Sequence, residues 1–294
     1  MKAFRQKGFW YPDKKMKRKL IYILALVFYQ VDAQSIKIHF ADSLFVTGNY
    51  INAINEYSKL GSEKASLQIA RAYNAIGNFE KAIAQYEALV SENSTLGIAK
   101  FELAKLYLKT KKYSQAKELL GVLTAEFPEN PEYHFYFGET IRENEDLDLA
   151  IPSYKNTVAV DSTHLSSLFQ LAKYYLIKRE RDSVLYFTNI GLNFYPNDVS
   201  LLNFKGLAYF NNDNFRDAIP YFEKLLDLGE SKSFLYQKLG YAYFKAWEFE
   251  KAKTMYKTAI GMEEDNPELY YELGHVYLKD RALDSAQFYV KKSI

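Results

Sequence analysis

Cysteine is absent from this 294-residue chain, which excludes disulfide bonds, cysteine-ligated zinc and thiol catalysis. Histidine is scarce, and the four copies at positions 39, 134, 164 and 275 include no pair at helical spacing. Neither the HExxH metal motif nor the phosphate-binding GxxxxGKS/T motif occurs anywhere in the sequence. We therefore expect a protein that is not an enzyme and that uses no metal ion or cofactor.

Glycine and proline are also few, with 13 and 7 copies, whereas tyrosine has 26 and phenylalanine 21. This balance favours helices packed through aromatic side chains over a sheet protein with many turns. The 38 basic and 36 acidic residues nearly cancel, and 48% of the chain is apolar. Such a composition is typical of a folded globular protein.

The first 33 residues have the pattern of a secretory signal peptide. A basic segment ends at Lys19, an apolar run extends from Leu20 to Val31, and Ala33 follows where a signal peptidase would cut. A helix as long as this run covers about 18 Å, less than the roughly 30 Å hydrocarbon core, which favours a cleaved leader over a spanning anchor. We expect export to the periplasm or secretion, and the alternative is a membrane anchor at residues 20–31.

Removal of residues 1–33 changes the charge balance. The leader holds eight of the 38 basic and two of the 36 acidic residues, which leaves 30 basic and 34 acidic side chains, a net charge of −4. The apparent basicity therefore belongs to the leader, and nucleic acid is not an expected partner. Membrane contact is expected only through an uncleaved leader.

The rest of the chain is periodic. The stretches GLAYFNNDNFRDA (206–218) and GYAYFKAWEFEKA (240–252) share a Gly, a Tyr three residues later, a Phe nine later and an Ala twelve later. Fixed spacing of this kind is typical of a repeat array. The small first residue, which we call the anchor, returns every 34 residues after a first step of 29, at Ala41, Ala70, Ala104, Gly138, Ala172, Gly206, Gly240 and Gly274.

Each copy has the pattern of a helical hairpin. An apolar residue just before the anchor and an aromatic residue three positions after it form an i, i+4 stripe on a first helix. A break such as Gly77-Asn78 follows, because Gly accepts a left-handed turn and Asn caps a second helix. The second helix carries a small residue and a larger one four positions later, as at Ala82 and Tyr86. One hairpin leaves an apolar face uncovered, so we expect the hairpins to stack.

At these residues the sequence resembles the tetratricopeptide repeat family, whose 34-residue unit reads Leu-Gly-x-x-Tyr, then Ala, then an aromatic residue, then often Pro. Pro128 and Pro196 stand at the closing proline. The resemblance implies an all-α fold, a right-handed α-solenoid of about eight helical hairpins with a concave groove lined by the first helices. It predicts an array over residues 34–294 with repeats at about 34–62, 63–96, 97–130, 131–164, 165–198, 199–232, 233–266 and 267–294.

The repeat at residues 165–198 departs most from the family pattern. Arg181, Thr188 and Gly191 stand where apolar, aromatic and apolar residues are expected. Stability in stacked repeats is close to a sum of unit and interface contributions. We therefore expect this repeat to open before its neighbours.

In the tetratricopeptide family, first-helix positions that are not used for packing line a groove that holds peptides or helices of other proteins. Aromatic rings alternate there with amides and cations in this chain, a surface that can pack on apolar side chains while it pairs with peptide backbone or carboxylates. The alternative is that the aromatic residues at one repeat position, Phe101, Phe135 and Phe169, complete the core between repeats. The candidate groove residues are Phe101, Lys105, Lys109, Arg142, Lys173, Asn203, Phe210, Gln237, Tyr241, Phe244, Lys245 and Tyr271.

Two functions fit these observations. The first is an exported adaptor that holds a peptide or helix of a partner protein in the groove. The second is a structural or self-assembling scaffold that uses the ends of the array, including a fragment of a longer regulatory protein. Under the second function, Tyr289 and Val290 near the C-terminal end have no following repeat to cover them, so contact between copies of the chain is expected there.

Overall fold

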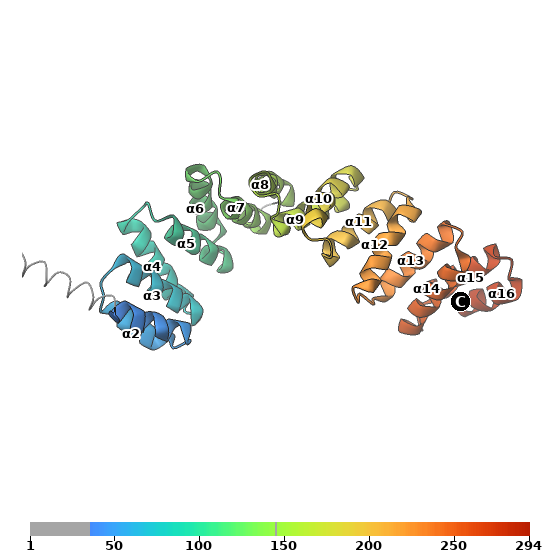
Figure 1. Ribbon diagram of the computed structural model, residues 1–294, viewed down its shortest axis with the longest axis horizontal. Coiled ribbons are helices and arrows are strands. Elements are labelled where there is room, and N and C mark those ends of the chain that lie inside the picture. The colour runs from blue at the N-terminus through green and yellow to red at the C-terminus, as the bar shows by residue number, and fades with distance from the viewer. Residues whose placement is uncertain (1–35, 145) are drawn as a thin grey trace, which may run out of the picture. The chain divides into compact units, whose positions relative to one another are not determined.

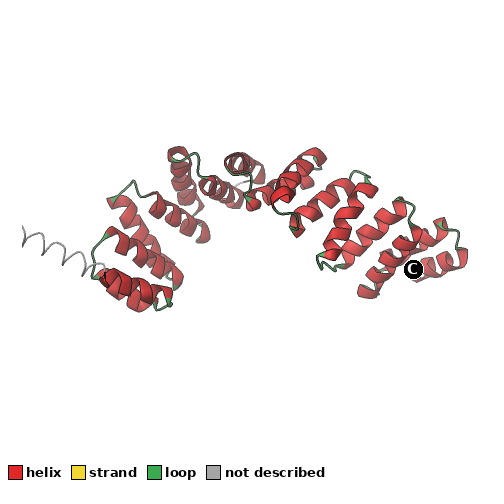
Figure 2. Cartoon of the chain, in the orientation of Figure 1, coloured by secondary structure: helices red, strands yellow, loops and turns green. Residues whose placement is uncertain are grey.

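The computed structural model describes residues 36–144 and 146–294, and the predicted leader at residues 1–33 lies outside them. Within this part of the chain, every regular element is a helix and there is no strand (Figure 2). None of the described helices is both long enough and apolar enough to cross a bilayer. The predicted all-α fold is therefore confirmed.

The described helices form eight consecutive pairs, one for each predicted repeat. Residues 36–46 are helical and precede the labelled helices. Those helices are α2 (Tyr50–Ser58), α3 (Glu63–Ala75), α4 (Phe79–Glu92), α5 (Gly97–Lys109), α6 (Tyr113–Glu126), α7 (Pro131–Asn144), α8 (Leu147–Val160), α9 (Leu165–Ile177), α10 (Arg181–Phe194), α11 (Val199–Phe210), α12 (Phe215–Asp227), α13 (Ser233–Lys245), α14 (Phe249–Met262), α15 (Pro267–Lys279) and α16 (Leu283–Lys292).

The chain divides into two compact units, one up to Leu119 and one from Leu120 to Ile294. In unit 1, helices α3, α4 and α5 pack in chain order (Figure 1). In unit 2, each helix from α7 to α16 contacts the next, and the first helices of consecutive repeats also meet, α9 with α11 and α13 with α15. Within each unit the hairpins thus stack as the repeat pattern requires.

The hairpin turns follow from residues with capping and left-handed preferences. The side chain of Asn78 accepts a hydrogen bond from the Lys81 amide at 3.2 Å, and that of Asp198 accepts one from the Leu201 amide at 2.8 Å. Such caps satisfy amide groups that the first turn of a helix leaves free. Seven residues after the anchor the backbone is left-handed, with φ of 78° at Gly77 and 67° at Trp247. That turn reverses the chain between the two helices of a repeat.

The glycine anchors let the second helix of a repeat approach the first closely. A Cβ atom at Gly206 would lie 2.6 Å from the ring of Phe222, and one at Gly240 would lie 3.1 Å from the ring of Tyr256. Both rings are fully or almost fully buried. The small anchor is therefore a packing requirement, because the large residue sixteen positions later fills the space beside it.

Candidate functional site

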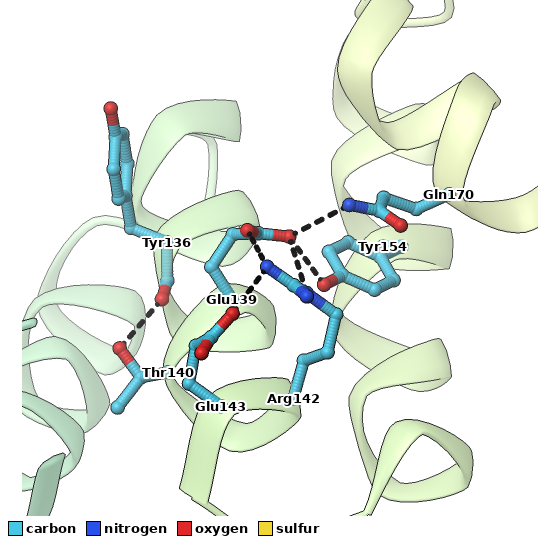
Figure 3. A network of polar contacts seen from close by, with 7 residues as sticks. All are labelled: Tyr136, Glu139, Thr140, Arg142, Glu143, Tyr154 and Gln170. Atoms are coloured by element: carbon cyan, nitrogen blue, oxygen red, sulfur yellow. Dashed lines mark hydrogen bonds and ion pairs between the residues drawn. The ribbon is translucent and has the colours of Figure 1, made fainter.

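A buried tyrosine hydroxyl meets a carboxylate in several repeats. In unit 2, the hydroxyl of Tyr154 on α8 donates a hydrogen bond to Glu139 on α7 at 2.6 Å, and Gln170 on α9 donates to the same carboxylate at 3.2 Å (Figure 3). Arg142 donates to Glu139 at 2.7 Å and also pairs with Glu143. Side chains from three consecutive helices thus converge on one carboxylate.

The same arrangement recurs in other repeats of both units. In unit 1, Glu102 accepts hydrogen bonds from the Tyr86 hydroxyl at 2.7 Å and from the Arg71 guanidinium. In unit 2, Gln237 donates to Glu272 at 3.3 Å, and Tyr256 lies close enough to this carboxylate for the two to affect each other's pKa. The tyrosines stand sixteen residues after an anchor, and the carboxylates stand one after that anchor or two before the next.

These contacts change the acidity of the groups that make them. Burial, together with the neighbouring carboxylate, raises the pKa of Tyr86 and Tyr154 far above the usual phenol range. Burial also raises the pKa of Glu272, although the hydrogen bonds from Gln237 and Tyr256 oppose this. Each tyrosine is therefore held as a neutral hydrogen-bond donor.

Six aromatic rings form a continuous cluster on α11 to α14 of unit 2. Phe210 lies 5.6 Å and Phe215 5.4 Å from Tyr241, measured between ring centroids. Tyr241 in turn lies 6.4 Å from Phe244. Phe249 continues the contact at 6.2 Å from Phe244, and Trp247 lies 5.7 Å from Phe249. Ring contacts at these distances are favourable in offset or edge-to-face geometry.

Two hollows lie along this aromatic cluster. The larger, which we call the groove hollow, has a volume of about 390 Å³ and is lined by Phe210, Asn211, Asp213, Phe215, Gln237, Lys238, Tyr241, Glu268 and Glu272. The smaller, which we call the turn pocket, has a volume of about 240 Å³ and is lined by Phe244, Lys245, Trp247, Phe249 and Lys279. The two hollows share no lining residue. The groove hollow combines rings with an amide, a cation and carboxylates, as peptide-binding surfaces do.

Family models match three segments of the chain. Tetratricopeptide repeat models cover residues 77–134 and 199–230, and a TPR repeat model covers residues 240–280. Tetratricopeptide repeats are therefore present in this chain. No curated protein matches it in sequence.

Solved structures of tetratricopeptide proteins share the fold. The C-terminal part of a TPR repeat-containing protein from Cytophaga hutchinsonii is 19% identical, with a TM-score of 0.67, over 80% of this chain and 99% of that one. A tetratricopeptide repeat protein from Parabacteroides merdae is 16% identical, with a TM-score of 0.53, over 83% of this chain and 99% of that one. At these identities the likeness shows the fold alone.

The tetratricopeptide framework brings some of the predicted groove residues of unit 2 together. Phe210, Gln237 and Tyr241 line the groove hollow, and Phe244 and Lys245 line the turn pocket beside it. Three other predicted groove residues of unit 2, Arg142, Asn203 and Tyr271, line neither of these two hollows.

Arg142 is already paired with two carboxylates, and Asn203 lines a separate hollow with Ser200 and Phe234. Tyr271 is half-exposed and packs on the His275 ring at 4.5 Å. These three residues therefore lie outside both the groove hollow and the turn pocket.

The remaining predicted residues lie near other rings. In unit 1, Lys105 lies 5.2 Å from the centre of the Phe101 ring, and Lys109 lies 4.4 Å from that of Phe79. In unit 2, exposed Lys173 lies 6.0 Å from the Phe169 ring. A lysine over a ring keeps its charge in water while its stem covers apolar surface.

Two of the aromatic residues at the shared repeat position pack within the core. Phe169 on α9 lies 5.2 Å from Phe204 on α11, and Phe135 lies 4.8 Å from the His164 ring. Both rings are partly buried, and Phe135 packs against the core cluster that contains Tyr154 and Leu168. Phe135 and Phe169 thus make ring contacts of the kind that the packing alternative describes.

The tyrosine–carboxylate contacts were missed by the sequence analysis, which assigned the tyrosines to packing only. A signal was present: the same repeat position holds Tyr86, Tyr154 and Tyr256, whereas Phe222 is one of the residues without a hydroxyl that stand there in other repeats. A hydroxyl in a buried position needs a partner. Across the described residues, no three histidine or acidic side chains gather in a way that would hold a metal ion.

Proposed function

We propose that this protein is an exported scaffold that holds a segment of a partner protein in the groove hollow of unit 2 and catalyses no reaction. Tetratricopeptide repeats indicate a protein–protein interaction scaffold. The single observation that carries the groove assignment is the set of rings and polar groups that meet there, Phe210, Tyr241, Gln237 and Glu272.

The polar groups of the groove hollow suit an extended or helical peptide. Gln237 offers an amide, and the ammonium group of Lys238 lies over the Phe210 ring, 4.6 Å from its centre. Amides and ammonium groups hydrogen-bond to peptide carbonyls, while the rings of Phe215 and Tyr241 cover apolar side chains. The polar groups would then orient the bound peptide, and the rings would supply most of the binding affinity.

Photo-crosslinking tests the groove assignment. Benzoylphenylalanine placed at Tyr241 or Lys238 is expected to give an adduct of one mass in cells that produce the protein. The same group at Tyr186, which is 61% exposed on the second helix α10, is the control and is expected to give none of it. Adducts from positions on α16 but not from the groove hollow would replace this function with an end-to-end scaffold.

Truncation of an anchoring ring is expected to weaken partner binding far more than removal of a rim charge. Tyr241→Ala should lower the affinity for the crosslinked partner about thirtyfold, which corresponds to roughly 2 kcal/mol for a buried aromatic anchor. Lys238→Gln should mainly change the salt dependence and the association rate. Surface plasmon resonance with the identified partner measures both.

The neighbouring Tyr243 separates binding from folding. It is 4% exposed, and its hydroxyl bonds to Glu223 in the core, so Tyr243→Ala should lower the melting temperature. A Tyr241→Ala protein that melts like the wild type but keeps full affinity would contradict the groove assignment.

The export proposal rests on the basic start, the apolar run at residues 20–31 and the small residue at 33. Protein recovered from the periplasm or the medium is expected to begin at Gln34. N-terminal sequencing measures this directly. An intact start at Met1 or Met16 on cytosolic protein would contradict export, and an intact leader in the membrane fraction would favour the anchored alternative.

A further inference from the structure

One turn of the array carries a residue that the fold does not require. Seven residues after the anchor the backbone is left-handed in both units, with Gly48, Gly77 and Lys111 in unit 1 and Arg179, Asp213 and Arg281 in unit 2. In unit 2 the turn between α13 and α14 has Trp247 there, with φ of 67°. Trp247 is the one aromatic side chain among the described residues at this position, and a bulky side chain is uncommon in this conformation.

Trp247 is also unusually exposed for its size. It is 72% exposed, although its ring lies 5.7 Å from that of Phe249. Most of the indole is therefore in contact with water. An exposed tryptophan at the end of a cluster of rings suggests a surface that becomes covered when a ligand binds.

The turn pocket beside Trp247 has room for one large side chain. Its volume of about 240 Å³ lies below the roughly 300–1,000 Å³ of small-molecule sites. Three rings line it, from Phe244, Trp247 and Phe249. Apolar walls of this kind favour an aromatic or long aliphatic side chain.

The acidic side chains near the turn pocket are already paired with lysines that do not line it. Lys251 pairs with Glu248 at 2.7 Å, and Lys253 pairs with Glu250 at 2.7 Å. Asp280 follows Lys279 in the chain, but its carboxylate pairs with Lys253.

Lys245 and Lys279 both line the pocket, and neither has a carboxylate at ion-pair distance among the residues that the structure describes. The two ammonium groups therefore give the rim an excess of positive charge.

We propose that the turn pocket binds an acidic peptide segment. One aromatic or large aliphatic side chain packs on Trp247, and a carboxylate beside it in the peptide accepts hydrogen bonds from Lys245 and Lys279. This site goes beyond the groove function, because the turn pocket and the groove hollow have no residue in common.

A peptide fits this site better than an anionic membrane does. Glu248 and Glu250 flank the turn in sequence and are 43% and 86% exposed. A flat anionic surface that reached Trp247 would meet both carboxylates, whereas a peptide side chain enters the pocket without meeting them. The charge pattern therefore favours an acidic peptide over a flat anionic surface.

The tryptophan content of the chain provides a direct test. There are only two tryptophans, Trp10 in the leader and Trp247, so the full chain with Trp10→Phe reports on Trp247 alone. The probe is the acetylated and amidated peptide Gly-Asp-Phe-Glu-Gly. We expect a saturable shift of the emission to shorter wavelength, because the indole leaves water, and a loss of this shift at high salt.

Matched peptides and variants identify the interactions. The peptides Gly-Asn-Phe-Gln-Gly and Gly-Asp-Ala-Glu-Gly remove the charge and the ring respectively, and each is expected to bind at least tenfold more weakly. Lys245→Gln and Lys279→Gln should weaken the response to a similar degree. Lys232→Gln, at the other end of α13 with an 81% exposed side chain, is the matched control and should leave it unchanged.

Several results would overturn the proposal. These are an equal response to all three peptides, no saturable response to the first, or an unchanged response in Lys279→Gln. A shift with phosphatidylglycerol vesicles but not with the peptide would assign the turn to a membrane surface instead. Loss of the response in Gln237→Ala would place the peptide in the groove hollow, which would refute the turn pocket while leaving the groove function intact.

Discussion

Truncation of Phe222 to alanine is expected to lower the free energy of unfolding by about 3–5 kcal/mol. The side chain is fully buried on α12 and belongs to the main core cluster of unit 2. Its ring also lies 6.0 Å from that of Phe210, one of the groove residues. The cost is at the upper end for a core residue because removal of the ring leaves a cavity between α11 and α12.

Gly206 supplies the second half of this prediction. A Cβ atom there would lie 2.6 Å from Cε1 and 2.9 Å from Cδ1 of the Phe222 ring. Gly206→Ala alone should therefore cost about 1–3 kcal/mol by overpacking. With Phe222→Ala already present, the added methyl group meets a cavity, so the same substitution should cost little or stabilise the protein.

The midpoint of urea unfolding, followed by circular dichroism, measures all four members of this cycle. Gly261→Ala on α14 is the matched control, since a Cβ atom there would meet nothing within 4 Å. It should raise stability by about 0.5–1 kcal/mol, as replacement of glycine within a helix commonly does. Equal costs of Gly206→Ala in the two backgrounds would show that the anchor glycine is not required by the ring.

The helical pairs could be predicted from the sequence because the 34-residue spacing repeats one local pattern of small and aromatic residues. Each anchor, such as Gly206 or Gly240, has its large partner sixteen residues later in the same repeat. A contact between residues so close in the chain can be read from spacing alone. The division into two units between Leu119 and Leu120 has no such local signal.

Contacts between repeats were harder to predict, because they depend on the identity of both partners. The repeat at residues 165–198 is one example: Gly191 has the Leu201 side chain in the space where its own would be, and Thr188 is fully buried. Leu201 comes from the next repeat, so the family pattern of one repeat does not reveal it. That this repeat opens first stays a prediction.

Only part of the candidate site could be predicted in the same way. Tyr241 and Gln237 were assigned to the groove from their positions on a first helix, and both line the groove hollow. Trp247 and Phe249 lie in the turn and on the second helix, so a rule based on first helices omitted them. The carboxylate partner of each buried tyrosine was also missed, because it comes from either of two repeats.

These tyrosines lead to an expected loss of stability at high pH. Burial and the partner carboxylates raise the pKa of Tyr154, Tyr243 and Tyr256 in folded unit 2 far above the value of about 10 in an unfolded chain. Their contribution to stability is then fully present below about pH 10. It is lost as the pH rises above this value, because only the unfolded chain releases the phenol protons.

The expected slope follows from the number of protons released. Each tyrosine that ionises only on unfolding lowers the free energy of unfolding by about 1.4 kcal/mol per pH unit. The three tyrosines of unit 2 are each no more than 4% exposed, so together they should contribute roughly 4 kcal/mol per unit above pH 10. Urea unfolding between pH 8 and pH 11.5 measures this slope.

A single substitution isolates one tyrosine from the lysines that titrate in the same range. Tyr256→Phe should cost about 1 kcal/mol at pH 7, because the buried hydroxyl beside Glu272 is lost. Above pH 10 the variant releases one proton fewer on unfolding, so its stability should fall less steeply. By about pH 11 the wild type should have lost about 1.4 kcal/mol that the variant keeps, which exceeds the initial cost of about 1 kcal/mol and reverses the order of stability. Tyr186→Phe, at a 61% exposed position, is the control for loss of one hydroxyl. Parallel curves for Tyr256→Phe and the wild type would mean that the buried hydroxyl ionises in the folded protein, and the tyrosine–carboxylate contact would not be what holds its proton.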